Sequence, residues 1–377
     1  MLYILNYSFS PNSAVSNRMI GYLKAMDKMG VDATFIVMMP DVSFSKLNLR
    51  FKHIKVEYLW ESMKINHRLL RPVYYRLFCR SIRKRLRSGD KVYTYGFNAL
   101  SIIGLNVKGV ECFCERTEHP DVVSAPASRL VVVKRKDVLP SLKAMKGIFV
   151  ISSPLRDYFI EQGINADKVH VINMTVDATR FEDIKKQQVK ERYIAYCGTA
   201  SNNKDGVDEL IKAFAIVAEK IKDIKLYIIG RTPSPKDEAG NIALIERLGL
   251  RERIAFQGLI PADKMPQLLK NADVVALDRP DSLQAKHGFP TKLGEYLLTQ
   301  NPVVVTKVGD IPKFLTDGET ALLSEERNAL EFASKLIWAL EHPVEAEEIG
   351  RRGSQVALRE FNSEIETRKM IDIIFSK

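Results

Sequence analysis

Hydrophobic positions in the first half of the chain occur in short runs separated by longer amphipathic stretches. Between the first two runs, residues 17–30 place Ile20, Leu23 and Met26 on one stripe and end at Gly30, which predicts a helix. Runs of this kind predict strands at Met1–Tyr7, Asp32–Met38, Lys91–Tyr95, Glu111–Cys114 and Gly147–Ser152. The alternation predicts a parallel sheet with helices on both faces.

The same rhythm restarts after a polar, charged stretch at Val176–Glu191, which is typical of a domain linker. Predicted strands are Tyr193–Cys197, Lys225–Ile229, Ile254–Gln257, Val274–Leu277 and Val303–Thr306. Predicted helices are Gly206–Lys220, Asn241–Leu248, Lys264–Asn271 and Thr291–Thr299. The pattern indicates two doubly wound, Rossmann-like α/β domains that face each other across a cleft. Ligands bind such domains at the carboxyl ends of the strands.

A length of 377 residues fits two domains of about 150–200 residues each. We place the first domain at residues 1–177 and the second at residues 178–355. The last segment, Val344–Lys377, has the pattern of two helices. We expect the final helix, residues 356–377, to pack back on the first domain.

The composition is that of a globular protein, with 46% hydrophobic and 27% charged residues. The N-terminus lacks the pattern of a signal peptide, and no apolar run reaches the length of a membrane span. The four cysteines form no C-x-x-C pair, which favours free thiols in a reducing compartment. Cys112 and Cys114 should share one face of a strand. The expected location is the cytoplasm.

A net charge of +11 indicates anionic partners, which include nucleotide phosphate, acidic lipid and nucleic acid. Residues 63–88 carry no acid and interleave aromatic residues and leucines with nine basic residues. These are Lys64, Arg68, Arg71, Arg76, Arg80, Arg83, Lys84, Arg85 and Arg87. Such a helix can lie on an anionic membrane surface. A solvated helix of the first domain and an RNA contact are the alternatives.

The stretch from His287 to Thr306 carries the most specific pattern for chemistry. A glycine-containing loop leads into a helix, and Pro290 is a candidate for the first helical residue. The free amides at such a helix start, together with Lys292, favour an anion. Glu295 lies on the side of the helix opposite Leu293 and Leu297. Its carboxylate can therefore accept hydrogen bonds from a ribose diol, unless it is simply an exposed glutamate.

Three further strand ends carry glycine and basic or exposed residues. The first strand of the second half ends at Gly198, and Lys204 follows in the loop before the next helix. Arg231 follows the strand that ends at Gly230. The run Ile254–Pro261 contains Gly258 and Leu259, where an aromatic base can lie. Lysine and arginine at such turns bind phosphate, although many surface loops contain them without a ligand.

Taken in order, these elements resemble the donor domain of the GT-B glycosyltransferases, specifically family 4. That family shows G-x(5)-K-G-like, I-x-G, F-x-G and E-x(7)-E elements in this order. The segments Val171–Phe181 and Val308–Leu323 also resemble phrases of the family. The resemblance is strong over residues 147–325 and weak over the first domain.

The resemblance implies a role for each matching residue. Glu295 would bind the donor ribose and Lys204 would steady the leaving diphosphate, both as part of the catalytic machinery. Gly258 and Leu259 would lie near the base. The substrate-binding loop residues are Gly198, Gly288, Phe289, Pro290, Thr291 and Lys292.

Two departures from the family pattern concern the donor site, and two further candidates come from the first domain. His287 stands where the first glutamate of E-x(7)-E is usual, so it is a substrate-binding candidate. Thr199 replaces a usual arginine, which leaves Arg231 as an alternative positive charge. In the first domain, C-E-R-T-E-H-P offers His119 as a catalytic candidate and Glu118 as a binding neighbour.

No D-x-D sequence occurs, so the metal-holding motif of the other glycosyltransferase fold is missing. We therefore expect no metal and no other cofactor, with protein donors balancing the charge of the diphosphate. The resemblance implies a retaining reaction in which the acceptor attacks the same face that the phosphate leaves.

The sequence thus predicts a retaining glycosyltransferase, hexosyl or other. It would move a sugar from a nucleotide-sugar to a glycan or lipid-linked acceptor in bacterial-type surface polysaccharide synthesis. It would lie peripherally on the inner face of the membrane through residues 63–88, without a nucleic acid partner. The alternatives are a GT-B nucleotide-sugar epimerase and a non-catalytic nucleotide-sugar binding protein. The absence of a G-x-G-x-x-G motif after any predicted strand argues against a dehydrogenase.

Overall fold

The computed structural model describes residues 1–9, 14–40, 50–59, 71–95, 105–123, 135–232 and 234–376. The chain forms two compact units. Unit 1 contains Met1–Asn173 and Ser363–Lys377, and unit 2 contains Met174–Asn362. The chain crosses between the units after Asn173 and after Asn362, whereas the sequence-based boundaries follow residues 177 and 355.

The described residues of unit 1 form a seven-stranded parallel sheet in the order β3-β2-β1-β4-β5-β6-β7. The strands are β1 Leu2–Phe9, β2 Ala33–Pro40, β3 Ile54–Tyr58, β4 Lys91–Tyr95, β5 Glu111–Arg116, β6 Gly147–Val150 and β7 Val169–Val171. The sequence predicts five of these strands and misses β3 and β7. The sheet-edge strand β3 is mostly half-buried, and β7 has three residues, so neither gives a clear apolar run.

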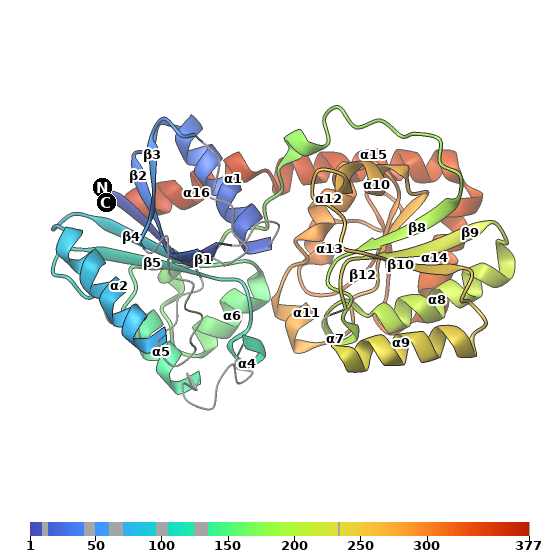
Figure 1. The fold of residues 1–377 in the computed structure, drawn as a ribbon, viewed down its shortest axis with the longest axis horizontal. Helices are drawn as coiled ribbons and strands as arrows, with labels where there is room; N and C mark the ends of the chain where they lie inside the picture. The colour runs from blue at the N-terminus through green and yellow to red at the C-terminus, as the bar shows by residue number, and fades with distance from the viewer. Residues whose placement is uncertain are drawn as a thin grey trace. The chain divides into compact units, whose positions relative to one another are not determined.

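Helices cover both faces of this sheet, as the alternating pattern predicts (Figure 1). The helices are α1 Ala14–Lys28, α2 Arg71–Arg85, α4 Pro120–Val123, α5 Arg135–Lys143, α6 Ser153–Glu161 and α16 Ser363–Phe375. Side chains of α1 and α16 share one core cluster, and side chains of α2, α5 and α6 share the other. Cys112 and Cys114 both belong to the second cluster, which confirms that they share a face.

The end of the chain returns to unit 1, as expected. Two helices, α15 Pro343–Glu360 and α16, form the predicted C-terminal pair. Helix α16 packs along α1, where Met370 and Ile374 are fully buried beside Met19 and Leu23. The prediction that the final helix packs back on the first domain is confirmed.

The described residues of unit 2 form a six-stranded parallel sheet in the order β10-β9-β8-β11-β12-β13. The strands are β8 Arg192–Cys197, β9 Ile224–Ile229, β10 Ile254–Gly258, β11 Val274–Leu277, β12 Val303–Thr306 and β13 Leu322–Ser324. Five of them match predicted strands, and the three-residue β13 escapes prediction. The strand order reverses between β8 and β11, which is the switch point where doubly wound sheets bind ligands.

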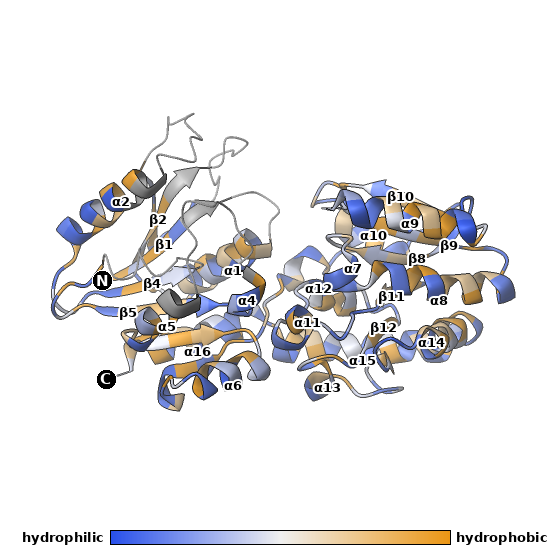
Figure 2. Ribbon diagram, turned by 90° about the horizontal axis from the view of Figure 1, so that it is seen from below, coloured by the Kyte–Doolittle hydropathy of each residue, from blue (hydrophilic) through white to orange (hydrophobic). Residues whose placement is uncertain are grey.

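The helices of unit 2 connect these strands and carry both polar and apolar residues, as helices with one face on a sheet must (Figure 2). Besides α15, they are α7 Asn202–Asp205, α8 Val207–Lys220, α9 Pro235–Arg247, α10 Met265–Asn271, α11 Leu283–His287, α12 Lys292–Leu298, α13 Ile311–Phe314 and α14 Ala329–Glu341. None of the helices in the described ranges is long and apolar enough to span a membrane.

Candidate functional site

The loop after β8 is the centre of the candidate site, because it lies at the switch point of the unit 2 sheet. The amide of Gly198 donates to the carbonyl of Ile229 at 2.8 Å, which binds the loop to the end of β9. Gly230 has a φ of +122°, and a Cβ there would lie 1.9 Å from the Gly198 carbonyl oxygen. Only glycine fits, and the ends of β8 and β9 approach each other closely.

Lys292, the first residue of α12, points back to this loop. Its Nζ forms an ion pair with Asp205 and lies 3.3 Å from the hydroxyl of Tyr196. A Cβ at position 198 would lie 2.0 Å from Nζ, so Gly198 makes room for the ammonium group. The Lys292 side chain is 16% exposed and that of Asp205 is 1% exposed. The sequence predicts a cation here, but it does not predict this carboxylate partner.

Asp205 is buried, yet it remains ionised. Burial alone would raise its pKa, but the positive charges of Lys292 and Arg279 outweigh that effect and hold the pKa below its usual value. Its Oδ2 accepts a hydrogen bond from Tyr196 at 2.8 Å. Burial lowers the pKa of Lys292, and the attraction of Asp205 opposes that effect. We call Tyr196, Asp205, Arg279 and Lys292 the Lys292 cluster.

Lys204 lies next to Asp205 on α7, a helix of four residues. Its side chain is half-buried, and its amide donates to the capping hydroxyl of Ser201 at 3.3 Å. Consecutive helical residues point about 100° apart, so Lys204 and Asp205 face different directions. In α7 it is Asp205 that turns toward Lys292.

Glu295 lies one turn further along α12, and its orientation agrees with the helical pattern. Leu293 and Leu297 are fully buried, whereas the Glu295 side chain is 22% exposed. Its carboxylate accepts from Nη1 of Arg180, and Nη2 of Arg180 donates to the Ala262 carbonyl at 2.8 Å. Sequence reasoning missed Arg180, although it lies within Val171–Phe181, a segment that resembles a family phrase.

The loop before α12 differs in detail from the prediction. Helix α12 begins at Lys292 with Thr291 as its N-cap, so the interpretation of Pro290 as the first helical residue is wrong. Pro290 lies in the preceding turn, where its carbonyl accepts from the amide of Leu293 at 2.9 Å. Phe289 is buried against Phe314 and Phe361, so its ring anchors the turn.

His287 and Gly288 precede that anchor. His287 is the last residue of α11, is half-buried, and places Nδ1 3.1 Å from the carbonyl oxygen of Leu283. Gly288 is the C-cap of α11, and its amide donates to Gln284. Both residues therefore lie at the junction between α11 and the turn that leads to Lys292.

The remaining donor-domain candidates follow β9 and β10, the two strands on one side of β8. Arg231 follows β9 with an exposed side chain, and its carbonyl accepts from the amide of Ala200 at 2.9 Å. Gly258 ends β10 with a φ of +64°, and Leu259 beside it is 76% exposed. An exposed leucine at a strand end offers an apolar surface for a flat ring.

In unit 1, His119 follows β5 and is 4% exposed. Its ring lies 4.1 Å from the ring of Tyr158, and Nδ1 accepts from the amide of Asp121 at 3.2 Å. Glu118 is half-buried. The fold therefore holds the His119 ring within unit 1 with a defined orientation.

A second buried charge cluster lies in unit 1 and was not predicted. Nε of Arg18 donates to Glu115 at 2.7 Å, and its Nη atoms donate to the carbonyls of Ile172 and Asn173 at 3.0 and 2.7 Å. Tyr93 also donates to Glu115. We call Arg18, Tyr22, Tyr93 and Glu115 the Arg18 cluster.

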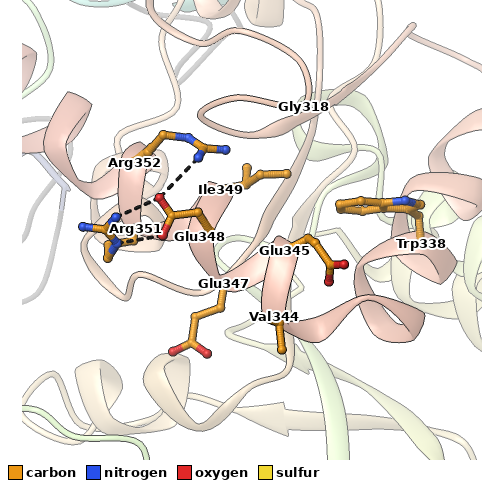
Figure 3. Close-up of a pocket in the computed structure, with 9 residues that line it drawn as sticks. All are labelled: Gly318, Trp338, Val344, Glu345, Glu347, Glu348, Ile349, Arg351 and Arg352. Atoms are coloured by element: carbon orange, nitrogen blue, oxygen red, sulfur yellow. Dashed lines mark hydrogen bonds and ion pairs between the residues drawn. The ribbon is translucent and has the colours of Figure 1, made fainter.

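A large hollow in unit 2 contains none of the predicted site residues. It has a volume of about 750 Å³ and is lined by residues of α14 and α15 and by Gly318 (Figure 3). Arg351 and Arg352 both pair with Glu348 there, at 2.7 and 3.2 Å. This region is therefore not the candidate site.

Comparison with known proteins gives a family match within unit 2. Residues 191–342 match the family model described as glycosyl transferases group 1. N-acetyl-alpha-D-glucosaminyl L-malate synthase of Bacillus anthracis is 27% identical over 158 residues, 42% of this chain and 39% of that protein. Mannosylfructose-phosphate synthase of Agrobacterium fabrum is 23% identical over 192 residues, 47% of this chain and 41% of that protein. The match thus spans about two fifths of each of these relatives.

Solved structures match over almost the whole chain. Anabaena HepE in complex with UDP and glucose superposes with a TM-score of 0.74 at 16% identity, covering 100% of this chain and 99% of HepE. Sucrose-phosphate synthase of Thermosynechococcus elongatus gives 0.73 at 15% identity, covering 99% and 97%. With two parallel-sheet units of this topology, the chain has the GT-B fold, and its residues 191–342 match the glycosyl transferases group 1 model.

Proposed function

We propose that the chain is a retaining glycosyltransferase that moves a sugar from a nucleotide-sugar to a glycan or lipid-linked acceptor. The Lys292 cluster carries this proposal, because it sets a buried cation against a glycine loop at the switch point of a glycosyl transferases group 1 domain. Glu295 lies one turn away on the same helix. A cation and a carboxylate at this spacing suit a diphosphate and a ribose.

The donor would lie along the carboxyl ends of β8, β9 and β10. Glu295 binds the ribose hydroxyls, and the base lies near Gly258 and Leu259. The amides of Phe289, Thr291 and Lys292, with Gly198 and a lysine, bind the diphosphate, and Arg231 adds charge at its edge. Support comes from Anabaena HepE, whose structure is a complex with UDP and glucose.

The reaction breaks the bond between the anomeric carbon and the diphosphate oxygen and forms a bond from that carbon to the acceptor oxygen. The departing phosphate oxygen takes the proton of the acceptor hydroxyl, and the attack occurs on the face that the phosphate leaves. Protein donors stabilise the charge that develops on the diphosphate, without a divalent cation. His119 and Glu118 keep the catalytic and binding roles that the resemblance implies.

The activity test begins with a thermal-shift panel of UDP-, GDP- and ADP-sugars, since a ligand that binds only folded protein raises its stability. The wild type should then release nucleoside diphosphate only when an acceptor is present, and the product should keep the anomeric configuration of the donor. Conversion of the donor without acceptor would instead identify an epimerase. Nucleotide binding without turnover would identify a binding protein. An unchanged thermal shift for Glu295→Ala would refute its ribose contact.

We further propose surface polysaccharide synthesis at the inner face of a cytoplasmic membrane, with α2 as the contact. Phe78, Ile82 and Leu86 of the 71–86 segment are buried in unit 1. The opposite side exposes basic residues together with two apolar ones. These are Val73, Arg76, Leu77, Arg80, Arg83 and Lys84. Lys64 and Arg68 lie outside the described residues, and Arg85 pairs with Glu57.

Co-sedimentation with vesicles tests this contact. Binding to phosphatidylglycerol vesicles should fade as salt rises, because screening weakens surface electrostatics. Arg76→Glu with Arg80→Glu should abolish binding, whereas Lys24→Glu with Lys108→Glu, which makes the same charge change at exposed positions elsewhere in unit 1, should preserve it. Equal binding to neutral vesicles would contradict the proposal.

A further inference from the structure

We propose that Lys292, rather than Lys204, supplies the charged side chain that binds the donor diphosphate, and that Asp205 is its positioning residue. The inference rests on the proposed function and assigns its main electrostatic contact to one side chain. It concerns unit 2 alone.

The position of Lys292 is the first argument. Its Nζ occupies the space that a side chain at residue 198 would need, since a Cβ there would lie 2.0 Å from Nζ and 2.6 Å from Cε. The ammonium therefore lies directly against the glycine loop after β8. Loops that end parallel strands in this way present backbone amides to phosphate groups.

The hydrogen-bonding capacity of the ammonium is the second argument. A lysine has three N–H donors. Among the described residues, Asp205 Oδ2 and the Tyr196 hydroxyl accept from Nζ of Lys292. The remaining donor is available to a ligand, and the Lys292 side chain is 16% exposed while Asp205 is 1% exposed. The accessible member of the pair is thus the cation.

The charge balance is the third argument. Two cations, Arg279 and Lys292, act on the single buried carboxylate of Asp205. The three charged side chains of the Lys292 cluster sum to one net positive charge. Arg279 is 2% exposed, so Lys292 is the cation of the cluster that a ligand can reach. An anion beside Gly198 would lie against that cation.

The orientation of α7 separates the two lysines. Asp205 points inward, and its Oδ1 has no hydrogen-bond partner in the described part of the chain. Lys204, one residue earlier, faces about 100° away on this single turn. The family element G-x(5)-K selects Lys204 by its distance from Gly198 in the sequence. In the structure, however, Asp205 is the residue of this turn whose side chain points inward. The cation then comes from α12, and the carboxylate fixes its position.

The experiment compares the affinities of UDP, GDP and ADP with those of their monophosphates by calorimetry. Lys292→Ala should reduce the preference of the wild type for its diphosphate by roughly 10–100-fold, as expected for a lost charged hydrogen bond. Lys204→Ala should reduce it less. Lys212→Ala, at an exposed position of α8, is the matched control and should leave both affinities unchanged. A larger loss for Lys204→Ala than for Lys292→Ala would overturn the inference.

Two further variants keep the test valid if Lys292→Ala fails to fold. Lys292→Met with Asp205→Asn removes both charges of this ion pair, so neither partner of the pair is left charged alone, and the diphosphate preference should still fall. Asp205→Asn alone should shift the basic limb of the turnover–pH profile to lower pH, because Lys292 loses the carboxylate that favours its charged form. Asp205→Glu should restore part of the wild-type profile. An unshifted profile for Asp205→Asn would remove the positioning role.

The outcomes distinguish this inference from the proposed function. If the wild type shows no preference for any diphosphate and releases none in the presence of acceptors, the proposed function fails. If the wild type shows both and the Lys292 variants retain the preference, the inference alone fails.

Discussion

The two units each bury a cation against a carboxylate near the carboxyl ends of their strands, but they leave these pairs in different states. In the Arg18 cluster, the arginine side chain is 2% exposed and donates to Glu115 and to two backbone carbonyls. In the Lys292 cluster, the lysine side chain is 16% exposed and keeps a donor available. A saturated pair stabilises structure, whereas an open pair can bind a ligand.

The Arg18 cluster shows what a saturated pair does. Arg18 of α1 donates to Ile172 and Asn173, the last residues of unit 1 before the chain crosses to unit 2. The amide of Asn173 donates to Glu366 of α16 at 2.7 Å. The cluster therefore anchors one crossing between the units and connects it to α16, which follows the other crossing.

The largest expected effect is on the stability of unit 1. Glu115→Ala leaves the buried guanidinium of Arg18 without its carboxylate, which should lower the free energy of unfolding by about 3–5 kcal/mol. Urea denaturation measures the change. Asp205→Asn should cost less, because the accessible Lys292 regains solvent contact. Equal losses for the two variants would remove the distinction between saturated and open pairs.

A smaller effect is expected from Asp278, a buried carboxylate of unit 2 that forms no ion pair with the residues that the structure describes. Burial, reinforced by the charges of Glu209 and Asp208, raises the pKa of Asp278 to about 8. The folded state therefore keeps a proton that the unfolded state releases above pH of about 4. Stability should fall as pH rises from about 4 to about 8. Asp278→Asn should remove about 1–3 kcal/mol of that fall.

Thermal or urea unfolding at pH 5 and pH 8 checks this prediction. The free energy of unfolding should fall more between pH 5 and pH 8 in the wild type than in Asp278→Asn. This difference should exceed the difference in stability between the two proteins at pH 5. A parallel dependence in the two proteins would show that Asp278 ionises normally. The contrast between Asp205, whose pKa Lys292 helps to lower, and Asp278, whose pKa is raised, would then be lost.

The smallest effect concerns the support of Glu295. Arg180→Ala removes the cation that orients this carboxylate, so nucleotide affinity should fall about fivefold, with little change in stability. Arg192→Ala is the control, because Arg192 pairs with Asp223 and Asp273 in the same unit. Equal affinities for Arg180→Ala and the wild type would show that Glu295 keeps its orientation without Arg180.

The comparison of the two clusters also shows what the sequence could predict. Apolar periodicity predicts most strands of both sheets, and a helical wheel predicts that Glu295 points away from Leu293. Periodicity does not predict β13 or β7, whose three residues give too short a pattern. The resemblance places Glu295 and Lys292 in one loop-and-helix segment.

The partners of these residues required the structure. Asp205 and Lys292 are 87 residues apart, and Arg180 and Glu295 are 115 apart. Such pairs form because the ends of parallel strands and the loops that follow them lie at one edge of the sheet. Local sequence patterns do not show which distant residues will be neighbours there. The choice between Lys204 and Asp205 depends on the direction of a single helical turn, which counting along the chain does not provide.

Unit 2 should neutralise a diphosphate with its own charged and backbone groups. This is measured by calorimetric titration of the wild type with its preferred nucleoside diphosphate, in excess EDTA and again with added Mg²⁺. The Kd should agree between the two conditions to within about twofold. Binding that disappears in EDTA and returns with Mg²⁺ would contradict it.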